Sequence, residues 1–119
     1  HFAGRHEDLL PWYRAASLMV HAASRESFGL VLAEAMACAL PIVATEAAGP
    51  REIIANGETG RLVAVDDEDG FAAAIEHYLN NPGLARRHGL AGHDRANRLF
   101  SIHRQGAAIA TAIRQVLDR

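Results

Sequence analysis

Cysteine, aromatic residues and long hydrophobic runs are all scarce in this chain. Cys38 is the one cysteine, so no disulfide can form within the chain, and a reducing compartment is favoured. The longest apolar run covers residues 30–40 and is interrupted by Glu34. A membrane-spanning helix needs about 20 apolar residues, so this run is too short, and no signal peptide is visible.

Neither sign of charge is in excess. The 12 Lys and Arg residues nearly balance the 14 Asp and Glu residues, and the formal net charge is −2. We therefore expect no nucleic acid as a partner, since phosphate backbones are bound through clustered positive charge. The seven histidines show no metal-ligand spacing such as His-Glu-x-x-His, so we expect no metal and no cofactor. Half of the 119 residues are hydrophobic, enough for the core of one domain.

Short apolar runs alternate with helical patterns along the chain, which predicts an α/β fold with a parallel sheet. The predicted strands are residues 17–22, 41–45 and 61–65. The predicted helices are residues 6–16, 29–40, 51–55 with Pro50 at the first position, one that begins in the acidic run 66–69, 83–97, and one from Ser101. We expect a three-layer Rossmann-like sheet, and a partial one, because such sheets have about six strands.

The stretch from His21 to Met36 is the most informative part of the chain. A polar loop holds Glu26, Gly29 closes it, and an apolar helix pattern follows whose one charge is Glu34. A carboxylate on a buried helix is costly unless something bonds it. Unpaired N–H groups at a helix start attract anions. Two carboxylates beside such a start suggest a pocket for a ligand that carries both phosphates and hydroxyls.

The sequence around the two glutamates resembles that of a known family. Glu26 and Glu34 have seven residues between them, in the run Glu-Ser-Phe-Gly-Leu-Val-Leu-Ala-Glu-Ala-Met-Ala-Cys. This run resembles the Glu-x7-Glu motif of the retaining, nucleotide-sugar-dependent glycosyltransferases of the GT-B fold, the "group 1" family. Residues 41–45 and 56–63 resemble the family too, in its order. The resemblance implies that residues 1–119 are a fragment of the C-terminal, nucleotide-sugar-binding lobe. They would hold its last three strands and C-terminal helices, and the N-terminal acceptor lobe would be absent.

The resemblance also implies the site residues. Glu34 would bind the ribose hydroxyls of the nucleotide, and Glu26 would be catalytic, beside the reacting carbon of the sugar. Backbone N–H groups would hold the diphosphate or the sugar at Ser27, Phe28, Gly29, Leu30, Val31 and Gly49. The family's Gly-Gly-x-x-Glu loop has Ala48 in place of its first glycine, which would be strained if that position needs a positive φ.

Each of these residues has a purely structural alternative. Glu34 could pair with an arginine, Glu26 could cap the helix, and the loop could be a plain strand-to-helix turn. His21 could be a satisfied core residue, and Cys38 an inert thiol inside an apolar helix. The Arg- and His-rich face of residues 83–97 is expected to be solvated. Ala39, where the family has a helix-ending glycine, is expected to let the helix run one residue longer.

The function implied by the resemblance is transfer of a sugar from a nucleotide diphosphate sugar to an acceptor hydroxyl with retention, without a metal. This fragment would supply donor binding and would be inactive alone. Expected partners are the nucleotide sugar, an acceptor carbohydrate or lipid, the missing lobe, and a second copy through the exposed sheet edge at residues 17–22. We expect a cytoplasmic location, peripheral to the membrane if the acceptor is a lipid. The alternatives are a nucleotide-sugar epimerase of the same fold and a non-catalytic nucleotide-binding lobe.

Overall fold

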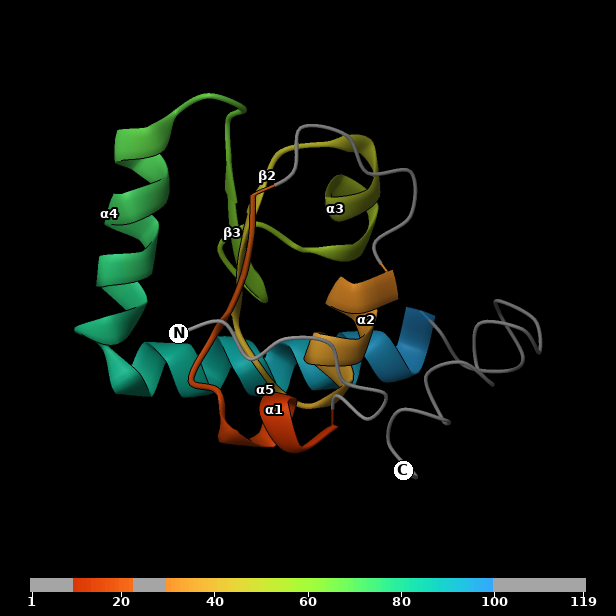
Figure 1. Ribbon diagram of the computed structural model, residues 1–119. Coiled ribbons are helices and arrows are strands. Elements are labelled where there is room, and N and C mark those ends of the chain that lie inside the picture. The colour runs from red at the N-terminus through yellow and green to blue at the C-terminus, as the bar shows by residue number, and fades with distance from the viewer. Residues whose placement is uncertain (1–9, 23–29, 100–119) are drawn as a thin grey trace.

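The computed structural model describes residues 10–22 and 30–99 of the chain, with backbone alone at residues 10, 30, 48 and 49. Three short strands form one parallel sheet in the order β1-β2-β3 (Figure 1). The strands are β1 (Met19–His21), β2 (Ile42–Thr45) and β3 (Gly60–Val63). In the pairing register, Val43 lies opposite Val20 of β1 and Arg61 of β3. The predicted α/β class and parallel sheet are therefore confirmed.

The described residues form five helices around this sheet: α1 (Leu10–Ala15), α2 (Leu30–Ala37), α3 (Ala48–Ile53), α4 (Glu68–Leu79) and α5 (Pro82–Leu99). Helix α4 lies on one side of the strands, and α2 and α3 lie on the other (Figure 1). Helix α5 runs from α4 to α2 past the end at which the strands begin, since Gly89 meets Ala39 and Pro41 just before β2. The expected three layers are present.

Two apolar clusters hold the layers together, one on each face of the sheet. Ile42 and Ala44 of β2 face the cluster of α2 and α3, and Val43 between them faces α4. All four residues of β2 are buried, as expected of a central strand covered by helices on both faces. The first cluster contains Tyr13, Leu32, Ala33, Ala35, Met36, Leu40, Ile42, Ala44, Ile53, Ile54 and Ala96. The second contains Val43, Val63, Ala74 and Tyr78.

Helix α2 ends earlier than predicted. Its last residue is Ala37, and Ala39 has a φ of 61°. The amide of Ala39 donates to the carbonyl of Met36, and the amide of Leu40 donates to that of Ala35. This pair of hydrogen bonds is common at helix C-termini, where it encloses a residue in the left-handed conformation, usually glycine. The expectation that Ala39 prolongs the helix is wrong, because it takes the conformation that a glycine would take.

Replacing Ala39 with glycine should raise the free energy of unfolding by about 0.5 to 1 kcal/mol. The gain is the relief of a left-handed alanine, about 1 to 2 kcal/mol, less the entropy that a glycine adds to the unfolded chain. Urea unfolding of the intact protein measures it. Ala72→Gly, at a solvent-exposed position in the middle of α4, is the matched control. It should lower the free energy of unfolding by about 1 kcal/mol. Equal losses in both variants would contradict the strain at Ala39.

Several predicted boundaries are wrong by a few residues. Helix α3 begins at Ala48, because Ala47 is the last extended residue, so Pro50 is its third residue. Strand β3 ends at Val63, because the chain turns at Asp66 with a φ of 70°. The strand predicted at 17–22 is shorter at both ends, and the helix predicted at 83–97 is longer at both ends.

The acidic run before α4 acts as predicted. The carboxylate of Asp67 accepts a hydrogen bond from the amide of Gly70 at 2.9 Å and caps the helix. The predicted helix from Ser101 and residues 6–9 lie outside the described residues. Among the helices that are described, none is both long and apolar enough to cross a membrane.

Candidate functional site

The three strands end at the same edge of the sheet, because they are parallel. In open α/β sheets, ligands bind at this carboxyl edge. His21 ends β1 there and is half-buried. Glu26, Ser27, Phe28 and Gly29, which the sequence predicts for the site, lie outside the described residues, so their roles stay predictions.

Helix α2 carries three further predicted residues. Leu30 and Val31 begin the helix, and Val31 is 38% exposed. The N–H groups of a first helical turn have no partner within the helix, so these two amides can donate to a capping side chain or to an anion. Glu34 follows in the second turn and is only 8% exposed. Helix α2 therefore combines amides that lack a partner within the helix at its start with a buried carboxylate in its second turn.

Glu34 is bonded by a phenol. The Tyr13 hydroxyl of α1 donates to Oε2 of Glu34 at 2.9 Å. Among the described residues Tyr13 is its one partner, so the pairing with an arginine that a purely structural role predicts is not found within residues 10–22 and 30–99. Burial, and then this bond, raise the pKa of Tyr13 above its ordinary range. Nothing local in the sequence aims the hydroxyl of Tyr13 at a residue 21 positions away.

Gly49 lies at the carboxyl end of β2, in the first turn of α3. Ala48 begins the same helix and is not among the residues with a positive φ. The predicted strain at Ala48 is therefore absent, because a helical alanine has a negative φ. Contact of Gly49 with a diphosphate stays a prediction.

The prediction of a solvated basic face on α5 is wrong for three side chains. His88 is buried and bonds the Tyr78 hydroxyl at 2.6 Å. Nδ1 of His93 bonds the carbonyl oxygen of Ala37 at 2.9 Å, and Nε of Arg95 donates to the carbonyl oxygen of Ile53 at 2.7 Å. These side chains fasten α5 to α4, α2 and α3. The small residues Gly89, Gly92 and Ala96 mark the same packed face and were the signal in the sequence.

Cys38 lies in the turn after α2 rather than inside the helix, which is a second consequence of the early helix end. It is half-buried, and burial raises the pKa of its thiol. A raised pKa leaves little thiolate, which agrees with an unreactive cysteine. Within the described ranges, no group of three or more His, Cys, Asp or Glu residues could hold a metal ion.

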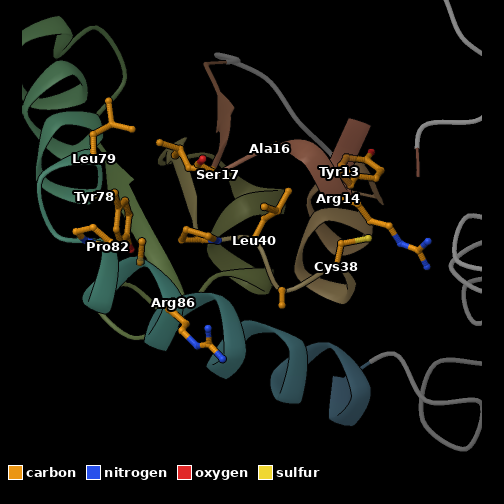
Figure 2. Close-up of a pocket in the computed structure, with 14 residues that line it drawn as sticks. Tyr13, Arg14, Ala16, Ser17, Cys38, Leu40, Tyr78, Leu79, Pro82 and Arg86 are labelled. Carbon is orange, nitrogen blue, oxygen red and sulfur yellow. The ribbon is translucent and has the colours of Figure 1, made fainter. Parts of the chain in front are cut away.

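Two of the cavities among the described residues lie at opposite edges of the sheet. One of about 400 Å³ lies where the strands begin, between α1, α4 and α5 (Figure 2). It is away from the carboxyl edge and so is not the predicted donor site, although Tyr13 lines it. The other, of about 390 Å³, lies at the carboxyl edge on the α4 face, with Thr45, Val65 and Phe71 in its wall. Glu34 lines neither of these cavities.

Comparison with known proteins agrees with this geometry. Residues 1–81 match the family model described as glycosyl transferases group 1. The chain is 38% identical over 118 residues to the lipopolysaccharide core biosynthesis mannosyltransferase LpcC of Rhizobium leguminosarum bv. viciae, covering 98% of this chain and 33% of that protein.

Two solved structures share its fold. Sucrose-phosphate synthase from Thermosynechococcus elongatus is similar with a TM-score of 0.77 and 36% identity, over 92% of this chain and 27% of that one. The Anabaena protein HepE, in complex with UDP-glucose, is similar with a TM-score of 0.74 and 25% identity, over 92% of this chain and 29% of that one. The chain thus spans about a third or less of these relatives. From its motifs, its parallel sheet and the match over residues 1–81, the chain belongs to the group 1 glycosyltransferases.

Proposed function

We propose that this chain supplies donor binding in an enzyme that transfers a sugar from a nucleotide diphosphate sugar to an acceptor hydroxyl with retention. The family match supports sugar transfer, since the similar proteins include a mannosyltransferase and a sucrose-phosphate synthase. The complex of HepE with UDP-glucose supports a nucleotide sugar as the donor. The acceptor, a carbohydrate or a lipid, would be bound by an N-terminal lobe.

The observation that carries this proposal is the buried carboxylate of Glu34. A carboxylate has about four lone-pair sites, and the Tyr13 hydroxyl occupies one of them. The remaining sites suit neighbouring hydroxyls such as those of a ribose. No cation of the described residues pairs with Glu34, so its remaining oxygen sites would be open to hydrogen bonds from a ligand.

The other predicted residues complete the proposed site. The amides of residues 27–31 and of Gly49 would hold the diphosphate and sugar oxygens at helix starts. Glu26 would place negative charge beside the positive charge that grows on the sugar carbon as the leaving group departs. The diphosphate would need positive charge from outside these residues or from Arg25 and Arg51, the basic residues nearest the two predicted loops. No metal enters this scheme.

The epimerase alternative is not favoured, because the matched family and the similar proteins are glycosyltransferases by name. The non-catalytic alternative, for which the change from glycine to Ala48 would be the best support, gains none from backbone strain, because α3 accommodates Ala48 without a positive φ. The anomeric configuration of the product, read by NMR, tests retention directly. Net inversion would contradict it.

Glu34→Gln in the intact protein should weaken nucleotide diphosphate binding about tenfold, the size of one lost charged hydrogen bond. Glutamine keeps the shape of the side chain and can still accept from Tyr13, so the fold should persist. Calorimetry with UDP, GDP and ADP measures the affinity and also identifies the base. Glu76→Gln, an exposed carboxylate on α4, is the control and should change nothing. Equal affinities of the wild type and Glu34→Gln would remove Glu34 from the site.

A further inference from the structure

A buried phenol and a buried carboxylate meet between α1 and α2. Tyr13 and Glu34 are each 8% exposed, and 2.9 Å separates the hydroxyl oxygen from Oε2. The two residues are 21 positions apart, so tertiary packing alone brings them together. A buried polar pair of this kind is stable only when both partners keep their bond.

Tyr13 acts as a hydrogen-bond donor in this pair. Burial raises the pKa of its hydroxyl, so the proton stays on the phenol at physiological pH. The phenol proton therefore points at one oxygen of Glu34 and holds that side chain in one rotamer. A free glutamate would lose up to about 2 kcal/mol of conformational entropy on being ordered by a ligand, and the tyrosine removes that cost in advance.

The tyrosine is itself held firmly. Its ring belongs to the apolar cluster of α2 and β2, with Leu32 and Met36. Helix α1 has only six residues, too few to be stable without tertiary contacts. Tyr13 is the one buried side chain among residues 11–15 of this helix, so it anchors α1. A hydroxyl fixed in this way can aim a carboxylate precisely enough to matter for binding.

We propose that Tyr13 is a positioning residue of the nucleotide site. It occupies Oε2 of Glu34 and leaves Oε1 to accept from the ribose, and it thereby sets the preference for ribose over deoxyribose. This inference rests on the proposed function, since it assumes that Glu34 meets the nucleotide. It assigns to α1, which precedes β1, a part in donor recognition.

The proposal is tested by calorimetry on the intact protein. The ligands are UDP, the nucleotide of one similar complex, and its 2′-deoxy and 3′-deoxy forms. Wild type should prefer UDP to at least one deoxy form. Tyr13→Phe should weaken UDP binding roughly five- to tenfold. The same variant should weaken binding of that deoxy form less than about twofold, so the preference for UDP over the deoxy form is largely lost. Tyr78→Phe, which removes the other buried phenol on α4, is the matched control and should keep the wild-type preference.

The proposal is overturned if Tyr13→Phe keeps the wild-type preference, or if it weakens UDP and the deoxy forms by the same factor, as general loosening would do. The double variant Tyr13→Phe with Glu34→Ala should be no weaker for UDP than Glu34→Ala alone, because no carboxylate is left for Tyr13 to position, and additive losses would also contradict the proposal. If Glu34→Gln itself binds UDP, GDP and ADP like wild type, the proposed function fails together with this inference. If only the Tyr13 results disagree, the inference alone fails.

Discussion

Gly89→Ala should lower the free energy of unfolding by about 3 kcal/mol, at the upper end of what an overpacked core costs. An added methyl group at Gly89 would overlap the carbonyl oxygen of Ala39 and would stand 3.4 Å from Cδ of Pro41. Neither neighbour can yield easily. Ala39 is held in the turn that ends α2, and the next residue, Leu40, is bonded back to the helix. Helix α5 would have to move away from α2, and contacts across that whole interface would weaken.

The same helix offers a matched control. Gly83 has no atom within 4 Å of where a methyl group would stand, so Gly83→Ala should gain up to about 1 kcal/mol from helix propensity. Urea or thermal unfolding of both variants in the intact protein measures the difference. A stable Gly89→Ala protein would mean that α5 does not approach Ala39 as closely as the structure shows.

Acid should destabilise the junction of α4 and α5 through His88. Burial first, and then the charges of Arg87, Arg61 and His77, lower the pKa of this imidazole. The folded protein therefore binds fewer protons there than the unfolded chain does. Its contribution to the free energy of unfolding is complete above about pH 6.5, the ordinary histidine pKa, and is lost as the pH falls below that value through the lowered pKa.

The partner of His88 keeps its proton throughout this range, because burial raises the pKa of Tyr78 to about 12. The 2.6 Å bond between them can thus run from the phenol to Nδ1 only while the ring is neutral. Tyr78→Phe should cost about 2 kcal/mol near neutral pH, since it leaves a buried ring nitrogen without its partner.

The acid effect is isolated by His88→Asn, which keeps an acceptor near the position of Nδ1 but cannot titrate. When the free energy of unfolding is measured between pH 5 and 8, it should fall less steeply with decreasing pH in His88→Asn than in wild type. His77→Asn, at an exposed position of α4, should keep most of the acid destabilisation, because His77 is the smallest of the four causes that lower the pKa of His88. Parallel curves for wild type and His88→Asn would show that His88 does not titrate differently in the folded protein.

The sequence alone determined the fold class and the family. Strands buried on both faces must be continuously apolar, so residues 41–45 and the helices around them were readable without any tertiary information. The order of motifs from Glu26 to residues 56–63 was enough for the family, which the match over residues 1–81 then confirmed. The start of α4 at Asp67 was also predictable from the sequence, because a capping side chain bonds an amide within the first turn of its own helix.

The tertiary structure decided whatever depends on residues far apart in the chain. The alanine at position 39 takes a left-handed turn because α2 has to reverse into β2 there, against the local preference of alanine. His88, which a local pattern assigns to solvent, is buried, and His93 is half-buried, because the small residues of α5 let that helix pack closely against α2. The hydroxyl of Tyr13 reaches Glu34 only because α1 folds back onto α2. A hydrogen bond depends on the position of two atoms in space, and a sequence specifies that position only through the whole fold.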